Sequence, residues 1–322
     1  MKPAASVILF TVLSGAGYGI LAVIALAALI GDLPGETAVA VWSLLVALGL
    51  VTVGLLSSTF HLGHPERAWR ALSQWRSSWL SREGCASLAT YLPAGLFGIG
   101  WVLLDRTDGV YAFLAVLTGS AAMTTVYCTG MIYGSLVTIP QWRQPLVVPL
   151  YLAFALATGS LICSTLFAML GAWIPWLAWL SALSLLGTWA LKRAYWHAID
   201  SAQTGSTTAT AIGLGAAAGL GAIGPVRPLD PPHSEENFIM KEMGFRVARK
   251  HGRKLRRLAL HLGGTLPILL VVGAIASPAA LASTILLALA LPPALLGVFV
   301  ERWLFFAEAT HKVMLYYGRQ TA

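Results

Sequence analysis

Ionisable side chains gather in one short segment, residues 58–84, of a chain in which they are otherwise sparse. Only 11% of the 322 residues are charged, yet this segment holds two histidines, two glutamates and four arginines: His61, His64, Glu66, Arg67, Arg70, Arg76, Arg82 and Glu83. Histidine and carboxylate side chains can pass protons near neutral pH, and arginine binds oxygen atoms of partners and ligands. We therefore expect the chemistry of the protein to lie in this segment.

Long apolar runs surround the segment. The chain is 57% hydrophobic, which exceeds the usual share for a soluble domain, and its charged fraction is less than half the usual one. Each run is long enough to cross a bilayer as a helix. Eight such runs are present: about 6–30, 37–60, 84–104, 110–133, 146–170, 173–191, 260–277 and 280–304. The sequence predicts an all-α integral membrane bundle of eight transmembrane helices.

The positive charges indicate the topology of this bundle. If alternate connections lie on opposite sides, one side receives both termini and every Lys and Arg except Arg106. The positive-inside rule then places both termini in the cytoplasm of a multi-pass protein of the bacterial inner membrane. We divide the chain into helices 1–6 with the 61–83 loop (1–191), a cytoplasmic basic loop (192–259), and helices 7–8 with a C-terminal tail (260–322). The net charge of +8 thus reports topology, and we expect no nucleic-acid partner.

The 58–84 segment itself predicts one further helix. Pro65 suits a first helical turn, and Trp69, Leu72, Trp75 and Trp79 then recur every three or four residues. This pattern is typical of an amphipathic helix lying in the membrane interface. Ser81 is the expected cap of the next helix, which places Glu83 in its first turn, where the helix dipole favours a carboxylate.

His61 and Glu83 flank the polar loop and admit two interpretations. They can exchange protons with a quinone headgroup, whose carbonyl oxygens gain or lose protons with its electrons. Alternatively, His61 only caps a helix while Glu83 pairs with Arg67 or Arg82. Ionisable groups at the membrane favour a function. The usual role of arginines placed like Arg67 and Arg70 is anchoring at the interface through lipid phosphate.

Other candidate groups are weaker. Cys85, Cys128 and Cys163 share no metal-ligand spacing, so no metal site of the protein's own is expected. A haem b needs two facing imidazoles, but no histidine lies mid-helix, which argues against it. In the last helix, Glu301, Arg302, Glu308 and His311 fit either a second proton path or a mutually neutralised cluster. The basic helix expected over about 234–258 fits a lipid surface or an acidic protein partner.

One motif resembles a known family. The run from His61 to Ala68, His-Leu-Gly-His-Pro-Glu-Arg-Ala, is followed by Ser81-Arg82-Glu83, with Glu83 twenty-two residues after His61. This pattern resembles the anchor subunits of dimethyl sulfoxide reductases, and weaker likenesses extend over the whole sequence: Tyr133, Thr138, Pro140, Trp142, Arg302, Phe305 and His311.

The resemblance implies an anchor for two partners, a molybdopterin catalytic subunit and a four-cluster iron–sulfur subunit, that exchanges electrons with menaquinone or ubiquinone. It assigns quinol binding to His61, Arg67 and Glu83, with His61 and Glu83 handling protons; Tyr133 and His311 join the quinone-binding candidates. The 192–259 segment, with its Leu229-to-Asn237 run, resembles a sub-branch of sulfite-oxidising complexes, so both dimethyl sulfoxide reduction and sulfite oxidation stay open. So do a secondary transporter and a purely structural anchor without quinone chemistry. Membrane lipid is a further expected partner.

Overall fold

A computed structural model describes residues 2–60, 62–202, 206–213, 226, 229–230, 235, 237–243 and 247–317, without the side chains of 247–250. The described residues form helices and no β-strand. The α-helices are α1 (Ala5–Leu29), α2 (Thr37–Thr59), α3 (Trp79–Gly98), α4 (Val110–Gly134), α5 (Val147–Met169), α6 (Pro175–Ser201), α7 (Thr208–Ala211), α8 (Phe238–Met243), α9 (Val247–Leu260), α10 (Leu266–Ala276) and α11 (Ala280–Ala307). Four short 3-10 or π segments lie between or after them: η1 (Pro65–Gln74), η2 (Ile99–Leu103), η4 (His261–Thr265) and, after α11, η5 (Lys312–Tyr317).

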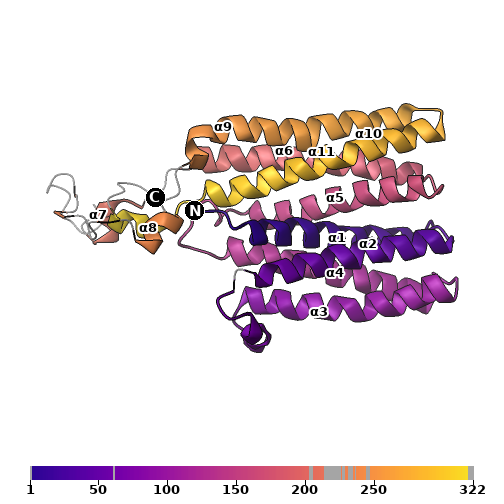
Figure 1. Ribbon diagram of the computed structural model, residues 1–322, viewed down its shortest axis with the longest axis horizontal. Coiled ribbons are helices and arrows are strands. Elements are labelled where there is room, and N and C mark those ends of the chain that lie inside the picture. The colour runs from indigo at the N-terminus through magenta and orange to yellow at the C-terminus, as the bar shows by residue number, and fades with distance from the viewer. Residues whose placement is uncertain are drawn as a thin grey trace.

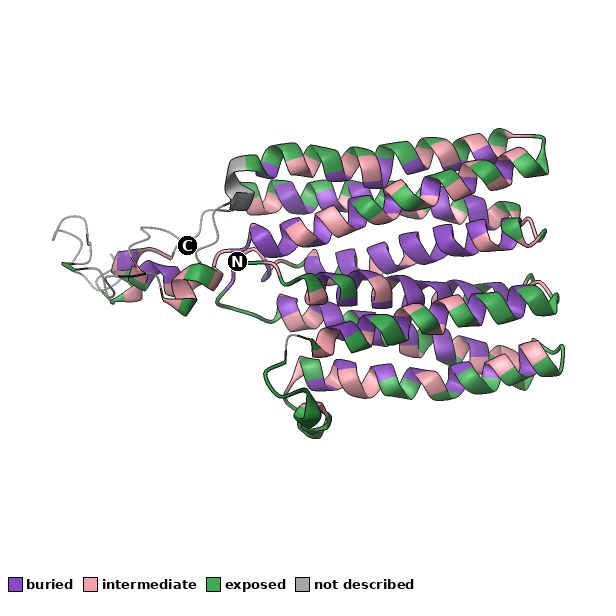
Figure 2. Ribbon diagram, viewed as in Figure 1, coloured by how far each residue is buried: buried purple, intermediate pink, exposed green. Residues whose placement is uncertain are grey.

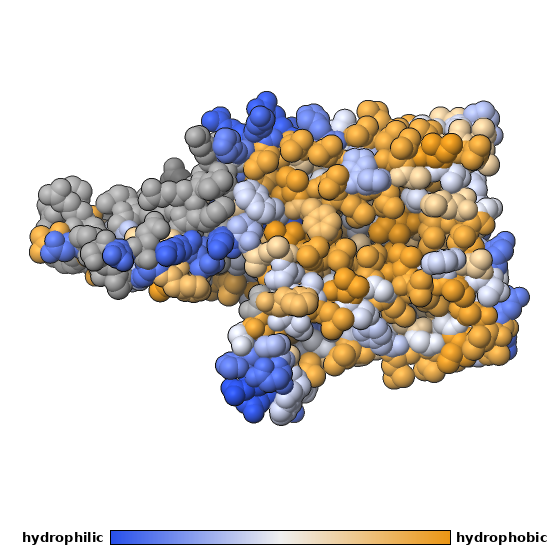
Figure 3. Space-filling view, in the orientation of Figure 1, coloured by the Kyte–Doolittle hydropathy of each residue, from blue (hydrophilic) through white to orange (hydrophobic). Residues whose placement is uncertain are grey.

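The long helices lie side by side in one bundle with an apolar surface (Figures 1 and 3). Within the described residues, 7 helical stretches are long and apolar enough to cross a membrane: α1, α2, α3 with η2, α4, α5, His251–Ala276 and α11. The prediction of an all-helical membrane protein is therefore confirmed. The eighth predicted span, α6, lies within the bundle but is less apolar, because it contains four tryptophans together with Lys192 and Arg193.

Helix α1 is the centre of one half of the bundle. It packs against α2, α4 and α5, and Figure 2 shows α1 and α5 as largely buried. Gly19 of α1 and Gly159 of α5 meet at their crossing, where the two backbones are in direct contact. Because lipid gives helices no hydrophobic reason to associate, small residues that allow such close approach are typical of membrane helix pairs.

We expect Gly19→Ala to destabilise the protein. A Cβ at Gly19 would overlap the carbonyl oxygen of Ala155 on α5, so the helices would have to separate, at a cost of roughly 1–3 kcal/mol. Gly15 is the matched control, because a Cβ there meets no atom within 4 Å. Thermal unfolding in detergent should show a lower midpoint for Gly19→Ala and little change for Gly15→Ala; equal midpoints would contradict this account of the crossing.

The polar loop differs from its prediction in two ways. Residues Pro65–Gln74 form 3-10 turns with no buried side chain instead of an amphipathic α-helix, so that prediction is not confirmed. Helix α3 begins at Trp79, and its cap is Ser78, whose side chain accepts a hydrogen bond from the backbone N–H of Ser81 at 3.4 Å. The prediction that Ser81 caps this helix was wrong. Because the helix starts earlier, Glu83 lies in its second turn, where the backbone enters the bundle.

The basic segment also differs from the single helix expected over 234–258. Among the described residues it forms α8 and α9, and α9 continues through η4 directly into α10. Helices α7 and α8 both pack against η5 beyond one end of the bundle (Figure 1); Tyr316 Oη of η5, for example, donates to the carbonyl of Ala211 of α7 at 2.9 Å. Helix α9 is therefore the polar extension of a membrane-spanning helix.

Candidate functional site

A cavity of about 550 Å³ opens where the polar loop meets the bundle. The polar-end residues of α1, α2, α3 and α4 form its walls, and 62–72 form its rim. Its lining is mostly aliphatic, with four chemically active side chains: His64, Arg67, Glu83 and Tyr133. A mostly apolar hollow of this size with a few convergent polar groups is typical of a small-molecule site.

Three of the five predicted site residues meet at this cavity: Arg67, Glu83 and Tyr133. His61 lies outside the described residues, although its neighbour Leu62 lines the rim. His311 does not line the cavity. Its Nδ1 accepts a hydrogen bond from the backbone N–H of Val313 at 3.0 Å, and partial burial lowers the pKa of its imidazole below the usual range.

Glu83 is a buried carboxyl group, with only 4% of its surface exposed. Its Oε1 accepts a hydrogen bond from the hydroxyl of Thr129 on α4. Among the described residues neither Arg67 nor Arg82 pairs with it, because Arg67 lies beside Glu66 and Arg82 donates to the carbonyls of Trp75 and Arg76. A carboxyl without a cationic partner at the wall of a cavity is suited to exchange protons with a ligand.

The mouth of the cavity carries cationic and polar groups from the 3-10 segment. The Arg67 and His64 side chains are both exposed, and both contact Glu66: His64 Nδ1 lies 3.0 Å and Arg67 Nε 3.7 Å from Glu66 Oε1. Both contacts are exposed to solvent, and surface contacts of this kind contribute little to stability. Both side chains are consequently free to turn toward a ligand.

Tyr133 forms the rigid end of the cavity. Its ring stacks on Tyr151 at 5.7 Å and meets the edges of Trp142, Phe305 and Phe306. Trp142 is held in turn by a 2.9 Å hydrogen bond from Nε1 to the carbonyl of Phe305. The aromatic cluster thus connects the cavity to α5 and α11.

A buried charge triad lies behind this aromatic cluster, and the sequence did not predict it. Lys192 Nζ of α6 lies 2.5 Å from Glu301 Oε1, and Arg302 Nε lies 2.7 Å from Glu301 Oε2. The side chains of Lys192 and Glu301 are each at most 1% exposed. The apolar run predicted as helix 6 ends at residue 191, which placed Lys192 in the basic loop. The sequence did contain a signal for the triad. Lys192 lies four residues before Trp196 near the end of one helix, and a Glu-Arg pair lies in another helix.

The acidic residues of the last helix therefore belong to two clusters instead of one. Glu301 belongs to the buried triad. Glu308 binds Arg256 of α9, with Nε to Oε1 at 2.8 Å, and the same arginine also binds Asp200 at 2.6 Å. Among the described ion pairs, His311 takes part in neither cluster. The alternatives of a proton path and a neutralised cluster stay open for the triad.

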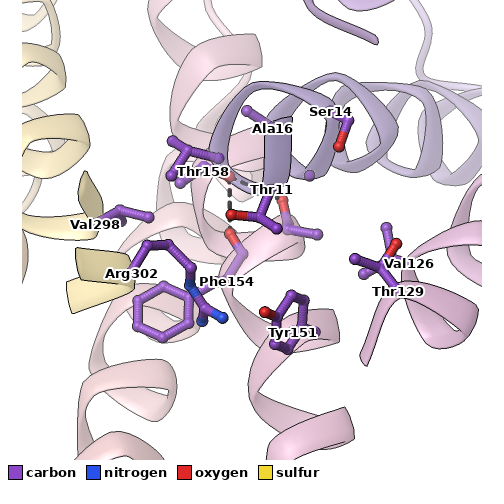
Figure 4. Close-up of a pocket in the computed structure, with 13 residues that line it drawn as sticks. Thr11, Ser14, Ala16, Val126, Thr129, Tyr151, Phe154, Thr158, Val298 and Arg302 are labelled. Carbon is purple, nitrogen blue, oxygen red and sulfur yellow. Dashed lines mark hydrogen bonds between the residues drawn. The ribbon is translucent and has the colours of Figure 1, made fainter. Parts of the chain in front are cut away.

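A small, mainly apolar cavity of about 20 Å³ lies between Arg302 of the triad and the part of α4 that bears Thr129 (Figure 4). The volume has room for about one water molecule. Thr129, the partner of Glu83, lines one side, and Arg302 the other. The Arg302 guanidinium group lies over the Tyr151 ring, with its Cζ 4.2 Å from the ring centroid, and neither the Tyr151 hydroxyl nor Arg302 Nη1 has a hydrogen-bond partner among the described residues.

Residues 1–214 match the family described as DMSO reductase anchor subunit (DmsC). The protein is also 34% identical to a subunit of the sulfite dehydrogenase of Allochromatium vinosum over 349 aligned positions, 98% of this sequence and 99% of that one. A subunit of the anaerobic dimethyl sulfoxide reductase of Escherichia coli is 32% identical over 138 residues, 42% of this sequence and 47% of that one. The protein belongs to the DMSO reductase anchor subunit family.

Membership in this family confirms the resemblance drawn from the motif that begins at His61, and the interpretation of the protein as a membrane anchor subunit of an oxidoreductase. The matched range of the anchor subunit includes every residue that lines the large cavity, and Lys192. Glu301 and Arg302 lie beyond it but inside the longer alignment with the sulfite dehydrogenase protein. Within the described ranges of the anchor subunit, no three His, Cys, Asp or Glu side chains gather in a metal-binding arrangement.

Proposed function

We propose that this anchor subunit binds a quinone in the large cavity and exchanges its electrons with an iron–sulfur subunit that is bound, in turn, to a molybdopterin catalytic subunit. The observation that carries the proposal is the buried Glu83, which has no cationic partner in the described part of the protein, on the wall of a mostly aliphatic cavity of about 550 Å³. An isoprenoid quinone needs both features, because its headgroup takes up or releases protons while its tail requires an apolar channel.

The side chains have separate roles in this proposal. Glu83 donates a proton to the headgroup when quinone is reduced to quinol, or accepts one when quinol is oxidised, and the Thr129 hydroxyl fixes the carboxyl in place. Arg67 at the mouth donates hydrogen bonds to a headgroup oxygen, and Tyr133 provides a rigid aromatic wall. His61 precedes the rim residue Leu62 and is assigned the second proton from its sequence position alone. His311 is left without a direct role, since it does not line the cavity.

The topology proposed from charge is supported by the arrangement of the helices. The start of α1 and the segment after α11 lie at the same end of the bundle, which requires an even number of crossings (Figure 1). We therefore include α6 as the eighth span. The opposite end holds Asp32, Glu36, Asp105 and Asp108 with Arg106. This distribution favours cytoplasmic termini in a bacterial inner membrane.

We infer a direction of electron flow from the two relatives. The alignment with the sulfite dehydrogenase protein spans nearly the whole sequence, whereas the alignment with the dimethyl sulfoxide reductase protein spans less than half of it. We accordingly favour sulfite oxidation, with electrons passing from the catalytic subunit to menaquinone or ubiquinone, over the reduction of dimethyl sulfoxide.

Filling the cavity tests the proposal. Ala68→Phe places a phenyl ring in the cavity without touching a charged residue, so quinone that co-purifies with the complex should fall by roughly tenfold. Ala89→Phe is the matched control, because Ala89 is an exposed residue of α3 outside the cavity. The quinone is extracted with organic solvent and quantified by chromatography. Equal quinone content in wild type and Ala68→Phe would leave a structural anchor without quinone chemistry at this site.

A further inference from the structure

Two adjoining hollows lie on the outer surface where α9 continues into α10 beside α6. The first, of about 600 Å³, is lined by His251, Lys254, Leu255, Arg257, Leu258 and His261. The second, of about 360 Å³, is lined mainly by apolar residues, among them Leu186, Trp189, Leu260, Ile268 and Leu269, with Arg193 as its charged member. Neither hollow shares a residue with the cavity that holds Glu83.

The two hollows follow one another along one helix face. His261 lines the first and Thr265 the second, and His261 Nδ1 lies 3.4 Å from Thr265 Oγ1. Residues 254, 258, 261, 265 and 268 recur every three or four positions, which places them on one side of the helix. A ligand of sufficient length can therefore occupy both hollows at once.

A π-helical turn shapes the second hollow. Within η4, Gly263 and Gly264 are pressed against the Trp189 indole, whose Nε1 donates to the Gly263 carbonyl at 2.7 Å. A Cβ at either glycine would clash with the indole. Because neither position bears a side chain, the surface of the helix is hollowed here, and Trp189 lines the bottom of the hollow. π-turns of this kind occur frequently at functional positions.

Every titratable side chain that lines the two hollows is basic, and none has an acidic partner among the described side chains. The contrast with Arg256 is direct, because this neighbour of Arg257 points into the bundle and binds both Asp200 and Glu308. The unpaired charges of Lys254 and Arg257 consequently face outward. Figure 3 shows hydrophilic surface over α9 giving way to hydrophobic surface over α10.

We propose that these two hollows form a binding site for an anionic phospholipid. The phosphate lies in the first hollow with Lys254 and Arg257, and an acyl tail lies in the second, against Leu186, Leu260 and Leu269. An acidic protein matches only the charge of the first hollow, since the second is lined mainly by apolar residues. A zwitterionic lipid matches only the second. An amphiphile with a negative headgroup matches both.

Lipid binding to the full anchor subunit in mild detergent tests this proposal, measured by native mass spectrometry with dioleoyl phosphatidylglycerol and dioleoyl phosphatidylcholine as probes. We expect wild type to prefer the anionic lipid, and K254Q/R257Q to lose that preference by roughly ten- to thirtyfold. R143Q/R253Q removes the same charge from exposed residues outside the hollows and should keep the preference. Ala190→Phe, which fills the second hollow without changing charge, should weaken the binding of both lipids.

The outcomes are decisive in either direction. An unchanged preference in K254Q/R257Q, or an equal loss in R143Q/R253Q, would overturn the site in favour of unspecific attraction to a basic surface. If the same variants are purified together with their partner subunits, loss of a partner from K254Q/R257Q with lipid preference intact would assign the basic face to a protein instead. Because the measurement involves no quinone, it is independent of the proposed function.

Discussion

Replacing Glu83 by glutamine is expected to lower quinone-linked turnover of the assembled complex by roughly a hundredfold or more, the usual contribution of a positioned acid–base group. Glutamine keeps the size of the side chain and can still contact Thr129, but it cannot take up or release a proton. Because Glu83 is buried and has no cationic partner among the described residues, no neighbouring carboxyl lining the cavity can replace it. The measurement is steady-state oxidoreduction with a soluble quinone analogue.

Two controls separate this effect from loss of assembly. Glu66→Gln removes an exposed carboxylate of the same loop and should leave turnover within about threefold of wild type, as expected for a solvated surface pair. An artificial electron acceptor that bypasses the anchor should show equal activity of the catalytic subunits in all variants. Full quinone-linked turnover in Glu83→Gln would remove the carboxyl from the proposed mechanism.

Replacing Glu301 by glutamine is expected to destabilise the anchor subunit by roughly 3–5 kcal/mol. The substitution leaves Lys192 and Arg302 as two buried cations without a counter-charge, since both now bind the same carboxylate. Buried charges are tolerated inside a membrane protein only when they are paired. Unfolding in mixed detergent micelles provides the free energy, and accumulation of the subunit in membranes provides a second measure.

The triad has one more positive than negative charge, so replacing its different members should change the stability by unequal amounts. Lys192→Met leaves Glu301 and Arg302 as a balanced pair and should cost about 1 kcal/mol or less. The double variant Lys192→Met/Glu301→Gln retains one unpaired cation and should be more stable than Glu301→Gln alone. Additive losses in the double variant would show that the three charges are not energetically coupled.

The amino-acid sequence was sufficient for the membrane fold and for the segment that bears the chemistry. Hydrophobic runs predict spans from composition alone, because a helix is the local way to satisfy backbone hydrogen bonds in lipid. Seven of the eight predicted spans meet the length and apolarity of membrane helices, and the motif from His61 led to the correct family. Helix ends were predicted less accurately, since capping depends on a single hydrogen bond; α3 starts at Trp79 with Ser78 as its cap, not Ser81.

Contacts between helices distant in sequence were decided only by the tertiary structure. Spacing along the sequence placed Arg67 and Glu83 in one loop, but only the packing of α3 against α4 gave Glu83 the Thr129 hydroxyl as partner in place of an arginine. Lys192 and Glu301 are separated by more than a hundred residues, and no periodicity relates them; their pairing exists because α6 and α11 both border the same aromatic cluster. Hydropathy is a property of each segment, whereas burial and charge pairing are properties of the assembled bundle.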